Sequence, residues 1–597
     1  MNSPTPPPVR RVRHPPAGRP LMVFDGDCDF CRHWIARWQQ ATGERVGYAE
    51  YQQAGQRFPE ISHATFQQAV QLIEPDGRVS GGADAVFRLL DFAPGIGRIS
   101  RLSRRLPGFM PAARAVYRFI AAHRGLFSVL TRLLWGRTFS KPKYLFARWL
   151  FVRMLGVVYL IAFVSLAVQI LGLIGKRGIL PAQSYLDAAR APLGRDRFWL
   201  LPTACWWNAS DGFLLFLCWL GAAVSALVIV TGVWPGACLA LLWASYLSLC
   251  VAGRVFMSYQ WDALLLETGL LAIFLNPPTA LRPRWNHETA SARVGRWLLL
   301  WLAFRITFES GLVKLSSGDP TWRNLTALGY HYETQPLPLA TAWYANQLPP
   351  GFQKMSCALM FGIELGAPFL IFGPRNLRRV GAGAMASLQL LIAATGNYTF
   401  FNLLTCSLYL LLLDDDVWPP GWRAVLVENA PRPAGRFHGV IHGGLLAPVA
   451  LLHTVLSLVP LVAARRARVA WPEPIAKLHS AVAPFRSCNG YGLFAVMTTS
   501  RPEIVIEGSD DGVTWLPYEF KWKPGDVDRK PGWCQPHQPR LDWQMWFAAL
   551  GDFESAPWLY HLLGRLLEGS PEVLRLLERN PFPQKPPQYV HALLYQY

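Results

Sequence analysis

A succession of long apolar runs between residues 149 and 464 constrains the fold of this chain more than any other feature. A helix needs about 20 mainly apolar residues to cross a bilayer, and the run at 150–174 is the clearest candidate. Further runs, several of them short and carrying charges, lie at 213–233, 237–252, 261–275, 295–315, 355–372, 380–394, 400–413 and 440–463. The sequence therefore predicts a transmembrane bundle at 149–464 with about nine spans.

The composition supports a membrane protein. Of the 597 residues, 52% are hydrophobic and only 16% are charged, which excludes an ordinary soluble multidomain protein. The formal net charge is +20, but neither a zinc spacing nor a basic strand motif with interleaved aromatic residues accompanies it, so we expect no nucleic-acid partner. The arginines flank the apolar runs instead, which favours contact with anionic membrane lipids.

The distribution of arginine and lysine predicts the orientation, because cytoplasmic loops carry an excess of both residues. They are dense at 101–148, 282–296, 375–379 and 423–436, and sparse at 316–354, which we expect to be an ordered outer loop. An odd number of spans places the N-terminal region in the cytoplasm and the C-terminal region outside. One feature disagrees with this orientation: three arginines follow the last span on its predicted outer side, at Arg465, Arg466 and Arg468.

Shifts in composition define the remaining domains. Residues 1–20 form a Pro- and Arg-rich arm that we expect to be disordered, and 21–121 form a first domain. Residues 122–148 form a basic juxtamembrane linker, and the basic stretch that contains them either lies along the inner membrane face or simply connects domains. Residues 465–597 are water-soluble in composition. Alternation at 503–507 and 515–522 predicts a hairpin in a β-rich domain, and amphipathic helices follow at 543–550 and 558–567.

Two cysteines in the first domain have the spacing of a redox pair. A strand at 21–24, a turn and a helix place Cys28 at a helix N-terminus, where free backbone amides stabilise a thiolate and make it the attacking group. Cys31, one turn later, can resolve a mixed disulfide. Asp25 either moves a proton for Cys31 or binds the backbone amides of the turn. Half of a zinc site is the competing interpretation, but no second ligand pair follows, so we expect no metal and no cofactor.

These residues resemble the DCC family of thioredoxin-like proteins, which carries an Asp-x-x-Cys-x-x-Cys motif. The similarity continues through an apolar strand at 70–73, a turn at 75–77 and a helix start at 81–86. It implies an α/β thioredoxin-like fold and thiol-disulfide oxidoreductase chemistry for 21–121. One departure is that no proline precedes Gly81, where thioredoxin-like enzymes usually have one beside the cysteines.

Ionisable residues inside apolar runs are expensive to bury and point to function or to ion pairing. Arg305 and Glu309 are four residues apart, a spacing at which they can form an ion pair on one helix face. Two interpretations stay open: a polar cavity for a substrate or client, and an ion-pair network that fixes helix packing. The full set is Asp262, Glu267, Arg305, Glu309, Lys314 and Glu364.

The region from 148 to 597 resembles the lipase maturation factor family. The residues that carry the resemblance are Phe304-Arg305-Ile306-Thr307-Phe308-Glu309-Ser310-Gly311 with 318–322 and 330–338, then Cys488-Asn489-Gly490-Tyr491-Gly492, and finally 536–547. The whole is predicted to be a multi-pass α-helical membrane protein with an N-terminal α/β thioredoxin-like domain and a C-terminal β-rich soluble domain. On an oxidising face Cys488 and Cys534 either pair or stay separate thiols. His537, Arg540 and Asp542 are candidate polar groups for a client, or turn residues.

The resemblance implies a membrane factor that helps secreted lipases or similar clients to fold and assemble. The alternatives are a membrane thiol-disulfide oxidoreductase, and a membrane enzyme distantly similar to vitamin K-dependent carboxylases. The fusion and the composition favour a bacterial inner membrane. The glycosylation triplets at Asn208, Asn324 and Asn397 keep the endoplasmic reticulum as the alternative.

Overall fold

A computed structural model describes residues 11–136, 142–275, 288–426, 436–465 and 469–597. Some predictions fall outside these described residues. They concern part of the disordered arm, the inner-loop residues Arg282, Arg284 and Arg432, and the residues Arg466 and Arg468. The chain forms two compact units, one comprising 1–143 with 374–377 and the other 144–373 with 378–597.

The N-terminal unit is built on a mixed sheet with strand order β2-β1-β3-β4. Strand β1 pairs in parallel with β2 and antiparallel with β3, and α1 and α4 begin where the sequence predicts helix starts. The predicted α/β thioredoxin-like domain is confirmed. The strands are β1 (Leu21–Phe24), β2 (Gly47–Glu50), β3 (Gln71–Ile73) and β4 (Val79–Gly81). The helices are α1 (Asp29–Thr42), α2 (Tyr51–Ala54), α3 (His63–Gln68), α4 (Gly82–Leu90), α5 (Gly97–Ser103), α6 (Phe109–Ala122) and α7 (Arg124–Trp135).

Helices α6 and α7 belong to this unit, which extends past the predicted boundary at residue 121. Helix α6 packs on α4, and α7 packs on α1. The apolar residues of α7 recur at helical spacing. Such a stripe can pack on a membrane surface or on a neighbouring helix, and the sequence alone does not distinguish these two arrangements.

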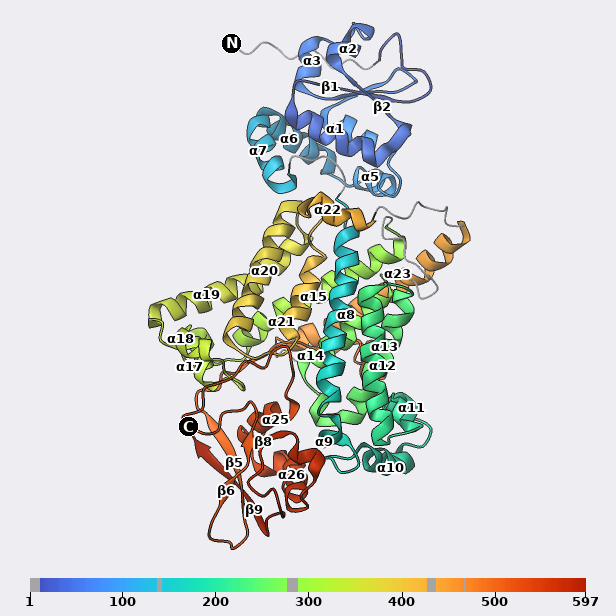
Figure 1. The fold of residues 1–597 in the computed structure, drawn as a ribbon. Coiled ribbons are helices and arrows are strands. Elements are labelled where there is room, and N and C mark those ends of the chain that lie inside the picture. The colour runs from blue at the N-terminus through green and yellow to red at the C-terminus, as the bar shows by residue number, and fades with distance from the viewer. Residues whose placement is uncertain (1–10, 137–141, 276–287, 427–435, 466–468) are drawn as a thin grey trace. The chain divides into compact units, whose positions relative to one another are not determined.

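The second unit contains the membrane bundle, in which every predicted span is helical. Helices α8, α12 and α13 lie side by side (Figure 1), and α15 contacts α14, α19, α21 and α23. The long helices are α8 (Leu145–Ala167), α12 (Asp211–Val230), α13 (Pro235–Gly253), α14 (Gln260–Ile273), α15 (Ala290–Ser316), α19 (Pro350–Gly366), α20 (Arg375–Thr395), α21 (Phe401–Leu410) and α23 (Arg436–Ala463). Short helices connect them: α9 (Ile170–Ile174), α10 (Ala182–Leu193), α11 (Arg197–Leu200), α16 (Pro320–Arg323), α17 (Ala327–Thr334), α18 (Ala340–Asn346) and α22 (Pro420–Arg423).

Five helices of the described residues are long and apolar enough to cross a membrane, which agrees with a multi-pass membrane protein. They are Leu145–Ala167, Asp211–Val230, Pro235–Met257, Pro350–Phe372 and Leu446–Ala463. Others, such as α14, are shorter, and α15 carries buried charges at Arg305, Glu309 and Lys314. The count of about nine spans therefore stays a prediction.

The C-terminal domain contains a three-stranded sheet of order β6-β5-β9 and a pair β7-β8. The predicted hairpin is confirmed, because β5 pairs antiparallel with β6. Strand β9, at the end of the chain, pairs antiparallel with β5 along its whole length. The elements are α24 (Glu473–Val482), β5 (Pro502–Ser509), β6 (Leu516–Pro517), β7 (Glu519–Phe520), α25 (Arg540–Ala549), α26 (Pro557–Leu567), α27 (Pro571–Leu574), β8 (Leu577–Arg579) and β9 (Tyr589–Gln596).

The C-terminal domain docks directly on the bundle. Helix α27 packs against α9, and the approach is so close that a Cβ atom at Gly172 would lie 2.5 Å from the carbonyl oxygen of Glu572. Buried rings continue across the same interface, where Trp261 of α14 meets Trp543 of α25 edge-to-face with centroids 4.7 Å apart. One apolar core thus joins the two parts.

Candidate functional site

The dithiol lies at the start of α1, after the turn that follows β1. Cys28 is the N-cap of α1, and its Sγ accepts a hydrogen bond from the backbone N–H of Cys31 at 3.3 Å. An N-cap sulfur in this position satisfies one of the amides that a helix start leaves free. Both thiols are free and partly exposed, so the predicted placement of the attacking group agrees with the geometry.

The two thiols differ strongly in acidity. The pKa of Cys28 is lowered to about 6, first by the hydrogen bond from the Cys31 side chain and also by the backbone N–H of Cys31 and the charge of Arg124. The pKa of Cys31 is raised, because its proton is held by Cys28 and the thiol is largely buried. At neutral pH this pair therefore holds one thiolate and one thiol, which is the state that thiol-disulfide exchange requires.

Asp25 has the contacts of a turn residue. Its carboxylate accepts the backbone N–H of Asp27 at 3.2 Å and the side-chain amide of Gln52 at 3.0 Å. Of the two roles predicted for Asp25, these contacts favour binding of the turn amides over proton transfer to Cys31.

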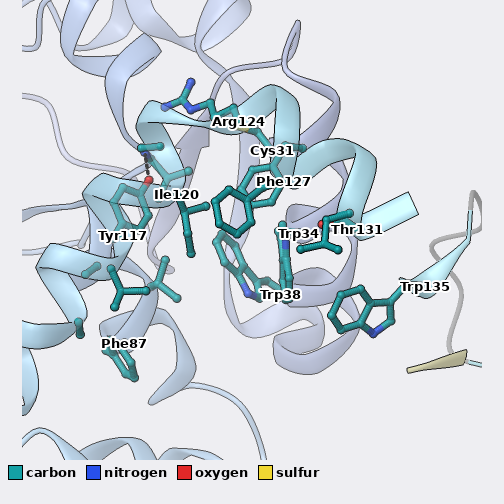
Figure 2. Close-up of a pocket in the computed structure, with 18 of the residues that line it drawn as sticks. Cys31, Trp34, Trp38, Phe87, Tyr117, Ile120, Arg124, Phe127, Thr131 and Trp135 are labelled. Atoms are coloured by element: carbon teal, nitrogen blue, oxygen red, sulfur yellow. Dashed lines mark hydrogen bonds between the residues drawn. The ribbon is translucent and has the colours of Figure 1, made fainter. Parts of the chain in front are cut away.

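An apolar cavity of about 650 Å³ adjoins the dithiol. Helices α1, α4, α6 and α7 form its walls, and the thiol of Cys31 is part of the lining. Figure 2 shows aromatic rings gathered along it, among them Trp34, Trp38, Phe127 and Trp135. The sequence does not predict this cavity, because its lining comes mainly from four helices whose mutual packing has no local signal.

In the second unit, two groups that the sequence placed in separate sites form one buried ion pair. Asp262 of α14 and Arg540 of α25 make two hydrogen bonds of 2.9 Å, with side chains 0% and 1% exposed. The hydroxyl of Tyr246 donates to the same carboxylate at 2.5 Å, and the Arg540 guanidinium also donates to the carbonyl of Phe256 at 2.6 Å. The pair therefore joins the C-terminal domain to the bundle.

A second buried cluster involves Glu267 and Arg305, which form an ion pair between α14 and α15. Tyr491 and Asn489, from the segment that leads into the C-terminal domain, also donate to the Glu267 carboxylate, at 2.8 and 3.0 Å. The predicted pair of Arg305 with Glu309 is not the one formed: the Glu309 carboxylate accepts the backbone N–H of Tyr491 at 2.6 Å instead. The helical spacing allowed that pair, but it carries no information on the partners that α14 and the segment at 489–491 bring to these charges.

Lys314 and Glu364 are the last two of the six ionisable residues predicted inside the bundle, and they form a buried ion pair. The Lys314 ammonium donates to both oxygens of Glu364 at 2.8 Å and lies 5.4 Å from the ring centre of Trp322. Each of the six ionisable residues predicted inside the bundle thus has a defined partner, and four of them, Asp262, Glu267, Arg305 and Glu309, bind the segment 489–540. This arrangement favours the ion-pair network over an open polar cavity.

His537 and Asp542 have different hydrogen-bond partners, although both line one small cavity of about 110 Å³. His537 Nδ1 lies 2.9 Å from the hydroxyl of Ser165 in α8, and burial lowers the pKa of this histidine to about 4. Asp542 accepts the backbone N–H groups of Trp522 and Lys523 at 2.8 and 2.9 Å. Their role toward a client stays a prediction.

Cys488 and Cys534 are free thiols in this structure, and their pairing also stays a prediction. Cys534 is buried, and its backbone N–H donates to Asn397 Oδ1 at 3.1 Å. Asn397 is itself 2% exposed, which leaves no room for a glycan on its side chain.

Comparison with known proteins follows this division into domains. The lipase maturation factor transmembrane domain matches residues 146–420, the lipase maturation factor C-terminal domain matches 487–597, and the DCC1-like thiol-disulfide oxidoreductase model matches 22–129. Lipase maturation factor 2 of Gallus gallus is 36% identical over 75% of this chain and 77% of its own length. Lipase maturation factor 2 of Homo sapiens is 36% identical over 75% of this chain and 79% of its own length. Lipase maturation factor 1 of Bos taurus is 34% identical over 75% and 83%, respectively.

No solved structure matches the chain. The relatives are vertebrate proteins, so the predicted bacterial inner membrane is not borne out, whereas the membrane character is. The family models and the level of identity to these relatives show that the chain belongs to the lipase maturation factor family and carries an additional N-terminal DCC1-like domain.

Proposed function

We propose that this membrane protein holds a secreted lipase, or a similar client, at its C-terminal domain while the client folds and assembles. The names of the relatives supply the client class. The observation that carries the proposal is the free edge of strand β9 (Tyr589–Gln596), which is the outer strand of its sheet.

Strand β9 lacks the protection that most edge strands have. An edge strand presents unpaired N–H and C=O groups, and soluble proteins usually shorten it or place charges on it. This strand has eight residues, none of them Asp, Glu, Lys or Arg. Leu594 is 61% exposed and Tyr595 is 47% exposed. Such an edge is suited to strand addition, in which an extended client segment pairs with the sheet.

A cavity of about 630 Å³ lies beside β9 and supplies space for client side chains. Tyr518, Phe520 and Val527 line it together with Tyr595 and Tyr597. In strand addition the backbone bonds give affinity and neighbouring pockets give preference for particular side chains. An extended segment with apolar residues at alternate positions fits this combination.

The two buried clusters, around Asp262 and around Glu267, attach the proposed client site rigidly to the bundle. Arg540 anchors α25 to α14, and Tyr491 anchors the preceding segment to α14 and α15. Because α25 also packs on β5, the strand that pairs with β9, the edge is held in place relative to the bundle. A fixed edge loses less conformational freedom when a client binds.

The proposal can be tested by introducing a lysine into the exposed edge strand β9. Leu594→Lys places a charge on the proposed client face, and we expect binding of a co-expressed secreted lipase to weaken about tenfold or more. Binding is measured by site-specific photocrosslinking in membranes, and secreted lipase activity is measured in parallel. Val513→Lys is the matched control, because Val513 is 81% exposed in the β5–β6 turn, which follows Ser509, whereas Leu594 pairs with Ile504 toward the other end of β5. Equal crosslinking in both variants would contradict the proposal.

For the N-terminal domain we infer thiol-disulfide exchange as a second activity. The low pKa of Cys28 at the start of α1 carries this inference. Cys31→Ala should trap a mixed disulfide of Cys28 with glutathione, whereas Cys28→Ser should form none. In vesicles of known orientation, an impermeant maleimide should label Cys28 and an introduced Val513→Cys from opposite sides. Labelling from one side would contradict the predicted odd number of spans and make direct oxidation of the client the better interpretation.

A further inference from the structure

The cavity beside the dithiol contains a hydrogen-bond donor without a partner. The indole N–H of Trp34, on α1, is buried and has no acceptor among the described residues. The same side chain lines the cavity that Cys31 also lines, one helical turn away (Figure 2). A buried donor costs free energy unless it binds an acceptor, so the cavity calls for a ligand with a polar oxygen.

The rest of the lining restricts what that ligand can be. Most of it is aromatic or aliphatic, and the walls are helices whose backbone groups bond within each helix. The backbone N–H of Val70 is also satisfied, by the hydroxyl of Tyr117 at 3.2 Å. A peptide in this cavity would leave its own backbone groups unpaired, at a cost that a hydrophobic small molecule does not have.

The outer surface of the same helices suggests where such a molecule comes from. Helices α6 and α7 expose apolar side chains outside the cavity, with Phe119 at 58%, Leu126 at 65% and Leu133 at 64%, among arginines. Basic amphipathic helices of this kind lie in the interface of a membrane. A ligand dissolved in the bilayer would therefore have a short path to the cavity.

From this arrangement we propose that the cavity is a binding site for a membrane quinone, which accepts the electrons of the Cys28–Cys31 dithiol. The head group is a planar ring with two carbonyl oxygens, and the cavity is within the size range of sites for small ligands. The N–H of Trp34 is buried in the cavity wall, so a rotation of the indole ring on ligand binding would bring it to one of these oxygens. The hydroxyl of Thr131 is a further donor in the lining, whereas the guanidinium of Arg124 already donates to the carbonyls of Gln67 and Gln68.

The reaction balances as a two-electron transfer. The thiolate of Cys28 and the thiol of Cys31 form one S–S bond, and the electron pair passes to the quinone. The proton of Cys31 and one proton from water complete the quinol. A disulfide then remains in the domain, ready to accept electrons from another dithiol.

This inference rests on the proposed thiol-disulfide activity, so the experiment separates the two. Reduced full-length protein in nanodiscs is mixed with decylubiquinone or with glutathione disulfide, and mass spectrometry follows oxidation of the peptide that contains both cysteines. We expect oxidation by both reagents. Oxidation by glutathione disulfide alone would overturn the quinone site and leave the thiol activity standing, whereas oxidation by neither would overturn both.

Variants of the cavity test where the quinone binds. Ala113→Phe fills the cavity and should slow oxidation by decylubiquinone about tenfold, with oxidation by glutathione disulfide unchanged. Ala115→Phe is the control, since Ala115 is an exposed residue of α6 outside the lining. Trp34→Phe keeps the ring but removes the N–H, and should weaken quinone affinity about fivefold.

A binding measurement without redox chemistry completes the test. In Cys28→Ser/Cys31→Ser protein, a photoreactive azidoquinone should label peptides within 109–135, and decylubiquinone should compete for the label. Labelling that is unaffected by Ala113→Phe, or that is displaced by an apolar peptide and not by decylubiquinone, would overturn the proposal.

Discussion

The ion pair between Asp262 and Arg540 should dominate the attachment of the C-terminal domain to the bundle. Arg540→Met removes the guanidinium and leaves a carboxylate that is 0% exposed and that, among the described residues, keeps only the Tyr246 hydroxyl as a polar partner. Removing one member of a buried pair costs about 3–5 kcal/mol, because the remaining charge is uncompensated. The attached state should therefore become roughly a hundredfold or more less favourable relative to the detached state.

The assay is urea-dependent pulse proteolysis of full-length protein in micelles, which reports the free energy of detaching the domain from the shift in midpoint. Lys477→Met is the control, since its partner Glu473 is 2.6 Å away but both side chains are 76% exposed. Such a pair contributes about 0.5 kcal/mol or less. In Asp262→Leu/Arg540→Met both charges are gone, and the cost should be well below the sum of the single costs. Additive costs, or an Arg540→Met no worse than Lys477→Met, would refute the reasoning.

Two other predictions concern the dithiol and the docking of α27. Alkylation of Cys28 by iodoacetamide should reach half of its maximal rate near pH 6, because below the pKa of about 6 the thiol is protonated. Cys31→Ala should move this midpoint upward and Cys31→Ser should move it less, since serine keeps a donor; equal midpoints would contradict the assignment. Gly172→Ala should cost about 1–3 kcal/mol in the same proteolysis assay, because its Cβ would lie 2.5 Å from the carbonyl of Glu572. Gly383→Ala meets nothing within 4 Å and should be neutral.

The features that the sequence predicts well have local signals. Strand β1, the turn and α1 follow from an apolar run, turn residues and helical spacing, and these also place Cys28 at the helix start. The β5–β6 hairpin follows from alternation around a turn. In each case the deciding contacts lie within a few residues of one another.

The partners of buried charges could not be predicted in the same way. The cost of burying Asp262 is visible in the sequence, but Arg540 lies 278 residues away, and the tertiary arrangement alone brings them together. For Arg305 the helical spacing suggested Glu309, whereas Glu267 on the neighbouring helix is the partner. The pairing of β9 with β5 could not be predicted for the same reason, because no local sequence pattern indicates which strand a terminal segment will pair with.

The contacts of α14 and α15 also set an order for biosynthesis. Both helices are synthesised before residues 489–540, which later bind Asp262, Glu267 and Glu309. Until then the nascent bundle carries carboxylates that are costly in hydrocarbon and lack part of their final partners. A chain that ends before Asn489 leaves all three carboxylates without these partners, and one that ends between Tyr491 and Arg540 leaves Asp262 without its arginine, which makes either chain a target for degradation. The bundle thus distinguishes finished from unfinished chains by its own electrostatics, before any client arrives.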